Sequence, residues 1–246
     1  MRLMLEILLS NDDGIDSPGL AALEQALGVL GRVWVVAPDG ERSASSRSIT
    51  LDRPLRVRQH APRRFAVDGT PADCVLLACR SLLPQVPQLV VAGVNLGYNI
   101  GEDLDYSGTV GAAAEGAQQR ARLAVAVSTV SSADQQLLLR AAGFAASLIG
   151  KLLEHLPPER TYLNINVPPD SNGQIRWTRQ GNPLPRGTVI IGSDPRGKKY
   201  YWIAERPDEK EPPPETDRGA LARGNISVSL LTLARDFPGR WQAPAL

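Results

Sequence analysis

The stretch LEILLSNDDGIDSPGL, residues 5–20, contains the beginning of the fold and of the candidate site. Residues 5–10 form a short apolar run, which is typical of a buried parallel strand. The polar loop Asn-Asp-Asp-Gly follows. Ser17-Pro18 then gives the start signal of a helix, with serine as N-cap and proline in the first turn, and we expect Gly31 to end that helix. The stretch therefore predicts a strand, a loop and a helix in immediate succession.

The same alternation continues to residue 168. Because strands that alternate with helices form βαβ units with right-handed crossovers, they place helices on both faces of a parallel sheet. We therefore predict an α/β fold with a three-layer, open, mostly parallel sheet over residues 1–168. The further strand signals are at residues 33–37, 88–94, 123–128 and 162–167, and the helix signals are at 17–30, 71–83, 108–119 and 133–156.

Residues 169–246 have a different character, since the part up to residue 223 is rich in proline, glycine and charge. Two short strand signals, at residues 188–191 and 199–203, predict a hairpin. Such a hairpin has too few apolar neighbours in this polar region to be stable alone. We therefore expect an extended arm that packs on another subunit or returns to the core, and not an independent domain. A returning strand is predicted at residues 225–233.

Composition limits the partners. Lys plus Arg number 27 and Asp plus Glu number 26, so the formal net charge is +1, and no broad positive field gathers a polyanion. Aromatic residues are 5%, which leaves few platforms for stacking bases. We predict no nucleic-acid polymer as partner. There is no run of 18 apolar residues, no signal-peptide pattern, and no disulfide or metal spacing at Cys74 and Cys79. These features predict a cytoplasmic protein without a membrane partner.

Three polar loops each follow directly on a predicted strand, at residues 11–14, 39–43 and 95–99. In an open parallel sheet the carboxyl ends of the strands share one edge, where ligands bind. We therefore expect the three loops to meet.

The side chains on these loops offer oxygen atoms. Asp12 and Asp13 are adjacent carboxylates, which repel each other unless a cation or a proton lies between them. Ser43 and Asn95 add a hydroxyl and an amide oxygen, and no His or Cys is nearby. This set suits Mg²⁺, Mn²⁺ or Ca²⁺ better than zinc. The competing interpretation of Asp-Asp-Gly alone is an ordinary turn.

A fourth segment, residues 106–109, is a hydroxyl-rich turn that enters a helix. Backbone N–H groups at a helix N-terminus bind phosphate, and Ser107 and Thr109 add hydroxyls to them. Gly108 permits close approach of the backbone. The competing interpretation is simple N-capping. Neither a P-loop nor a GxGxxG turn is present, which argues against a dinucleotide.

Taken together, these motifs resemble the stationary-phase survival protein SurE family, the 5′/3′-nucleotidases. The resemblance implies a Rossmann-like core, hydrolysis of nucleoside 5′- and 3′-monophosphates with one divalent cation, Mg²⁺ or Mn²⁺, and C-terminal arms that exchange between subunits of a homodimer or homotetramer. The matching stretches are SNDDGIDSPGL (10–20), VVAPDGERSASSRSIT (35–50), DGTPADCV (68–75), AGVNLGYNIGEDLDYSGTVGAAAEG (92–116), YLNINVP (162–168) and TDRGALARGNISVSL (216–230).

The resemblance also implies roles for residues. It assigns the metal to Asp12, Asp13, Ser43 and Asn95, the same four oxygen donors as above. It assigns the reacting phosphate to the loop with Ser107 and Thr109, and Asn99 to the same pocket. The predicted catalytic residues are Asp12, Asn99, Ser107 and Thr109.

The sequence thus predicts a metal-dependent phosphomonoesterase that acts on a small nucleotide. Two roles are open for Asp12: it aligns or deprotonates the attacking water, or it is a covalent nucleophile as in aspartyl-phosphate enzymes. The alternative function is a nucleotide- or sugar-phosphate-binding protein without catalysis.

Overall fold

The computed structural model describes residues 4–181, 186–205 and 211–234. Its main sheet is nine-stranded, in the order β3-β4-β2-β1-β5-β6-β7-β11-β8. All pairs are parallel except β3–β4 and β7–β11. The strands are β1 (Leu5–Ser10), β2 (Gly31–Pro38), β3 (Val57–Ala61), β4 (Arg64–Val67), β5 (Leu89–Leu96), β6 (Leu123–Thr129), β7 (Thr161–Val167), β8 (Ile175–Thr178) and β11 (Ile226–Thr232).

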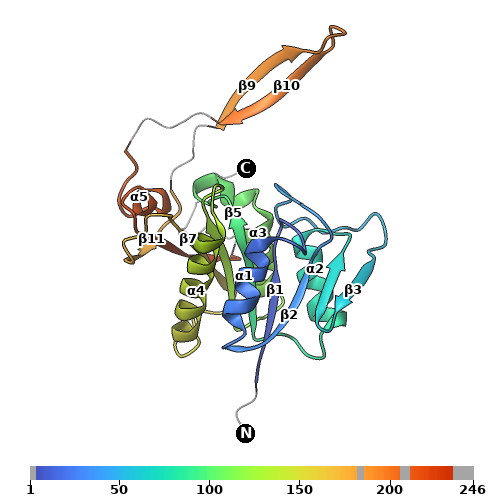
Figure 1. The fold of residues 1–246 in the computed structure, drawn as a ribbon, viewed down its shortest axis with the longest axis vertical. Coiled ribbons are helices and arrows are strands. Elements are labelled where there is room, and N and C mark those ends of the chain that lie inside the picture. The colour runs from blue at the N-terminus through green and yellow to red at the C-terminus, as the bar shows by residue number, and fades with distance from the viewer. Residues whose placement is uncertain (1–3, 182–185, 206–210, 235–246) are drawn as a thin grey trace, which may run out of the picture.

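Helices cover both faces of this sheet (Figure 1). One buried cluster joins α1 (Pro18–Leu27) and α4 (Gln135–Leu152) to the sheet, and a second joins α2 (Pro71–Leu77) and α3 (Gly108–Gln118) to its other side. The predicted α/β fold with a three-layer, mostly parallel sheet is therefore confirmed. The chain runs from β1 outward through β2 and then returns to β5 on the opposite side of β1. Ligands of such sheets bind at this reversal of strand order.

Local signals set the helix starts. Ser17 Oγ accepts a hydrogen bond from Leu20 N at 3.2 Å, so it caps α1 as predicted. Thr70 and Asp73 form a reciprocal capping box at the start of α2. The predicted end of the first helix was wrong, because α1 ends at Leu27 and Gly31 opens β2. A Cβ at Gly31 would lie 2.2 Å from Leu5 O, so glycine is needed there for close strand pairing.

Several elements were not predicted. Strand β3 is exposed along its whole length and has no apolar alternation, which is why the periodicity missed it. The short strands β4 and β8 and the five-residue helix α5 (Asp217–Leu221) were also missed. The predicted helix at 71–83 divides into α2 and a π-helical segment, η1 (Ala78–Leu82).

The C-terminal region has two structural parts. Strands β8 and β11 extend the main sheet beyond β7, and β9 (Arg186–Ser193) with β10 (Lys199–Glu205) forms a separate two-stranded hairpin. Figure 1 shows this hairpin standing away from the sheet. The hairpin exposes large apolar side chains, for example Trp202 at 67%. The part of the predicted arm region at residues 182–185, 206–210 and 235–246 lies outside the described residues. No helix in the described ranges is long and apolar enough to cross a membrane.

Candidate active site

The loop after β1 contacts the loop after β2 through its backbone. Gly14 has a φ of +100°, and a Cβ on it would meet the backbone of Gly40 at 3.0 Å, so glycine permits this close approach. Arg42 N donates to Asp12 O at 2.7 Å. The two loops are thereby held side by side at the carboxyl edge of the sheet.

The Asp12 carboxylate lies at the N-terminus of α3 and is 5% exposed. Its Oδ2 accepts from Thr109 N at 3.1 Å, and its Oδ1 accepts from Thr109 Oγ1. Burial raises the pKa of Asp12, and hydrogen bonds from Thr109 and Gly108 oppose that rise. A Cβ at Gly108 would lie 2.9 Å from Asp12 Cβ, so only glycine allows the carboxylate to sit this close to the helix.

This arrangement corrects one expectation about α3. Its first turn was expected to offer free N–H groups to a phosphate. In the structure Asp12 Oδ2 accepts a hydrogen bond from Thr109 N. Ser107 accepts from the next two N–H groups: Val110 N donates to Ser107 Oγ at 3.1 Å, and Gly111 N donates to Ser107 O at 3.0 Å. The anion at this helix terminus is the Asp12 carboxylate, which the helix dipole favours. The Ser107 hydroxyl keeps its own proton for donation.

Asp13 connects the first loop to the end of β5. Burial raises the pKa of Asp13 to about 6, the negative charges of Asp12 and Glu41 add to the rise, and a hydrogen bond from the backbone N–H of Leu96 opposes it. Asp13 Oδ2 is buried and has no hydrogen-bond partner. A buried carboxylate oxygen without a partner is costly unless a ligand completes it.

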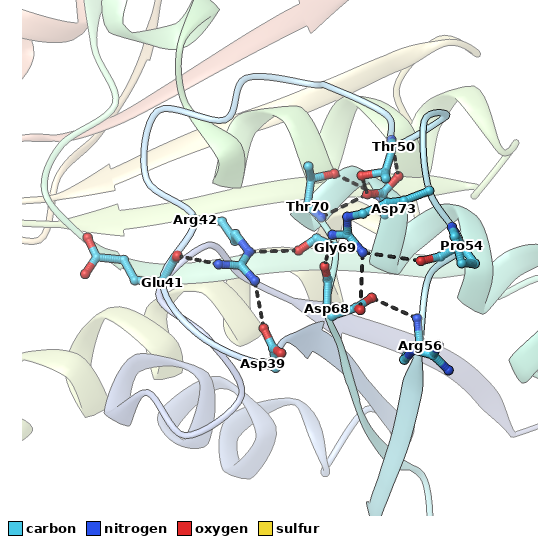
Figure 2. A network of polar contacts seen from close by, with 11 residues as sticks. Asp39, Glu41, Arg42, Thr50, Pro54, Arg56, Asp68, Gly69, Thr70 and Asp73 are labelled. Carbon is cyan, nitrogen blue, oxygen red and sulfur yellow. Dashed lines mark hydrogen bonds and ion pairs between the residues drawn. The ribbon is translucent and has the colours of Figure 1, made fainter.

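The loop after β2 is held in place by the side chain of Arg42 (Figure 2). Its guanidinium forms an ion pair with Asp39 at 2.8 Å and donates to Gly69 O at 3.3 Å. Ser43 is exposed, and its hydroxyl donates to Glu41 Oε1 at 2.7 Å rather than to Asp12 or Asp13. Arg42 therefore orients the loop. The role of Ser43 as a metal ligand stays a prediction.

The far end of that loop is tied to the start of α2. Asp73 accepts from Thr50 N at 2.9 Å and from Thr50 Oγ1 at 2.6 Å (Figure 2). Thr70 Oγ1 donates to Ser48 O at 2.7 Å. The capping box of α2 thus also fixes residues 48–50. Both ends of the segment that carries Ser43 are anchored.

The asparagines after β5 are oriented through their amide nitrogens. Asn95 Nδ2 donates to Gly97 O at 2.7 Å, and Asn99 Nδ2 donates to Ser128 Oγ at 2.8 Å. In each case the amide oxygen is the atom left for a ligand. No hydrogen bond joins Asn99 to Asp12 or Asp13 among the described contacts, so its place in the reacting pocket stays a prediction.

Two buried asparagines on β7 were missed by the sequence reasoning. Asn164 Nδ2 and Asn166 Nδ2 both donate to Asn99 O, at 2.8 and 2.9 Å, and Asn166 Oδ1 accepts from Asn99 N at 3.0 Å. Both are fully buried. The sequence pattern that could have indicated them is two amides at alternate positions of an apolar strand. Such side chains share one face of the sheet and, when buried, need hydrogen-bond partners there.

Unpartnered oxygens gather at this site. Within the described residues five buried side-chain polar atoms lack a hydrogen-bond partner, and four of them come from residues 10–13 and the neighbouring Ser45. Ser45 Oγ would lie 2.6 Å from a Cβ on Gly108, which places it against the same helix terminus as Asp12. The four are Ser10 Oγ, Asn11 Oδ1, Asp13 Oδ2 and Ser45 Oγ.

This donor chemistry fits a hard divalent cation, which prefers oxygen ligands. The described part of the chain holds no group of three or more His, Cys, Asp or Glu side chains that could hold a metal. A cation bound here would therefore take hydroxyl or amide oxygens and water beside Asp12 and Asp13, as Mg²⁺ commonly does.

Comparison with known proteins gives a consistent result. The family model described as "Survival protein SurE" matches residues 7–185. The chain is 44% identical over 232 residues to a protein named 5′-nucleotidase SurE from Geotalea uraniireducens, with 93% of each chain covered. It is 43% identical over 229 residues to the protein of that name from Alkalilimnicola ehrlichii, covering 92% of this chain and 88% of that one.

A solved structure agrees in fold. The crystal structure of SurE protein from Aquifex aeolicus superposes with a TM-score of 0.81 at 39% sequence identity, over 94% of each chain. Sequence similarity and structural similarity therefore indicate the same family. This chain belongs to the survival protein SurE family.

Proposed function

We propose that this protein is a 5′-nucleotidase, a divalent-metal-dependent phosphomonoesterase that releases phosphate from nucleoside monophosphates, including 3′-monophosphates. The observation that carries the proposal is the buried Asp12 carboxylate at the N-terminus of α3, next in sequence to Asp13, whose buried Oδ2 has no partner. The relatives named 5′-nucleotidase SurE, which match over nearly the whole chain, support the same activity.

The two carboxylates would hold one Mg²⁺ or Mn²⁺, together with the oxygens of Ser43 and Asn95. When bound, the cation supplies charge stabilisation to a phosphoryl oxygen, which is worth several kcal/mol in such reactions. Binding at this position needs Ser43 to turn from Glu41, a rotation that an exposed side chain makes at little cost.

The chain's own groups then act on the substrate. Thr109 and the first turn of α3 fix the Asp12 carboxylate, so that it aligns the attacking water or accepts its proton. The Ser107 hydroxyl donates a hydrogen bond to a phosphoryl oxygen, and the Asn99 amide oxygen accepts a hydrogen bond from a substrate hydroxyl or from water. Direct attack by Asp12 is the competing mechanism. Quenching during turnover and finding phosphate on Asp12 would establish it.

The deciding experiment is hydrolysis of a generic aryl phosphate with Mn²⁺ or Mg²⁺, repeated with EDTA. We expect turnover that EDTA abolishes and that Asp12→Asn abolishes in a folded protein. Binding of AMP without turnover under all these conditions would favour a nucleotide-binding protein instead. Full activity of folded Asp12→Asn would refute the site.

We further propose that the protein is a cytoplasmic homodimer or homotetramer assembled through the β9–β10 hairpin. The support is the apolar surface of this hairpin: Ile191, Tyr201, Trp202 and Ile203 are each more than 60% exposed in the single chain. Surfaces of this kind mark protein interfaces.

A further inference from the structure

Asp217 connects α5 to two distant backbone segments. It is fully buried, its Oδ2 accepts from Gly101 N at 2.8 Å, and its Oδ1 accepts from Gly181 N at 3.0 Å and from Arg218 N at 2.7 Å. Gly101 lies in the loop that leads to the candidate active site, and Gly181 lies between β8 and the hairpin. One carboxylate therefore holds both segments.

A second contact from the C-terminal region holds the same glycine. Gln180 Nε2 donates to Gly101 O at 2.7 Å, so both backbone polar groups of Gly101 are bound by residues after β7. Gly101 has a φ of +54°, a conformation that glycine adopts without strain. A Cβ at Gly181 would lie 2.8 Å from Asp217 Oδ1, so the second segment also needs glycine for this approach.

A short helical segment connects the anchored Gly101 to Ser107, the residue that we propose donates to the phosphate. The 3-10 helix η2 (Gly101–Asp105) begins at the anchored glycine, and Ser107 N donates to Asp103 O at 3.0 Å. At its other end Ser46 Oγ donates to Asp105 O at 2.7 Å. Residues 101–107 thus form one hydrogen-bonded unit that links Gly101 to Ser107.

We propose that Asp217, assisted by Gln180, is a positioning residue that sets the location of Ser107 for the reacting phosphate. This inference rests on the proposed phosphatase function. It gives the region after β7 a role in completing the active site, in addition to extending the sheet and carrying the hairpin.

A purely structural role makes a different prediction. If Asp217 only stabilised the fold, its loss would reduce the fraction of folded enzyme and leave the KM of the remaining molecules unchanged. A positioning role changes the site in every folded molecule. Since a displacement of about 1 Å can reduce a rate about 100-fold, kcat/KM is a sensitive measure of it.

The test compares Asp217→Asn and Gln180→Ala with Glu6→Gln as matched control. Glu6 is also a buried carboxylate, 4% exposed, and accepts from Trp34 Nε1 at 2.6 Å, but it lies at the opposite edge of the sheet. For Asp217→Asn we expect kcat/KM for AMP to fall about tenfold to a hundredfold. The inhibition constant of inorganic phosphate should rise with it. Gln180→Ala should give a smaller change in the same direction, and Glu6→Gln only a lower melting temperature.

Two further measurements separate this proposal from the proposed function. Calorimetric titration with Mn²⁺ should give the same affinity in all variants, because the described contacts of Asp217 and Gln180 include none of the four proposed metal ligands. Hydrogen exchange should accelerate in residues 97–107 of Asp217→Asn and Gln180→Ala, but not of Glu6→Gln. Unchanged exchange there, or unchanged KM and phosphate inhibition in folded variants, would overturn the positioning role. Absence of turnover in the wild-type chain would count against the proposed function alone, since exchange still reports on the loop.

Discussion

Replacing Asp13 by asparagine should stabilise the metal-free protein at neutral pH while removing its response to metal. Burial, with the neighbouring charges of Asp12 and Glu41, raises the pKa of Asp13 from 3.8 to about 6 in the folded chain. The charged form is therefore disfavoured by folding. Asparagine keeps the shape and an acceptor for Leu96 N but carries no charge.

The sign follows from linkage. Below pH 3.8 the carboxyl is protonated in both the folded and the unfolded chain, so the substitution changes the unfolding free energy little. As pH rises from 3.8 to about 6, the Asp13 carboxyl ionises in the unfolded chain before it ionises in the folded chain. The free energy of unfolding of the wild type therefore falls over this pH range, whereas that of Asp13→Asn does not, because asparagine has no proton to lose. At about 1.4 kcal/mol per pKa unit the upper bound is about 3 kcal/mol. Because the side chain is partly exposed, solvent screening reduces the expected gain to roughly 1–2 kcal/mol.

The assay is urea unfolding of wild type and Asp13→Asn in EDTA at pH 4 and pH 8, then at pH 8 with Mn²⁺. In EDTA the variant should be the more stable protein at pH 8, and the two should converge at pH 4. With Mn²⁺ the order should reverse, because wild type gains about 2.7 kcal/mol at a metal concentration 100 times Kd and the variant does not. A variant that is less stable than wild type in EDTA at pH 8, or that keeps the full stabilisation by Mn²⁺, would refute the reasoning.

Three other predictions follow from the site and the surface. Gly108→Ala should lower kcat/KM at least about tenfold and lower the free energy of unfolding by about 1–3 kcal/mol, because the new Cβ would lie 2.6 Å from Ser45 Oγ. Unchanged kinetics with AMP would contradict the close packing of Gly108 against the site. Light scattering at micromolar concentration should show a dimer or tetramer, and Trp202→Glu should shift it toward monomer; a monomeric wild type would contradict the hairpin interface. Hydrolysis of AMP and GMP should exceed that of single-stranded oligonucleotides at equal phosphate and fixed salt, since the net charge is +1; faster, strongly salt-dependent cleavage of the oligonucleotides would show a different substrate class.

The sequence by itself determined the parts of this protein that depend on neighbouring residues. The apolar run before Asn11, the cap at Ser17, and the alternation of strands and helices act within a few residues, and the structure confirms each of them. The oxygen-only character of the loops was also visible, because it depends on residue type alone. Strand β3 was not, since an exposed edge strand needs no apolar pattern.

The tertiary structure decided which polar groups meet. Asp12 and Thr109 are 97 residues apart in sequence, Asn99 and Asn166 are 67 apart, and Gly101 and Asp217 are 116 apart. Nothing in the local sequence indicates these pairs, because a buried donor takes whichever acceptor the packed sheet brings within reach. Only the folded chain therefore shows that the Asp12 carboxylate occupies the helix terminus expected to bind phosphate. The physical reason is that caps and periodicity are local, whereas the satisfaction of buried polar groups is a property of the whole packed molecule.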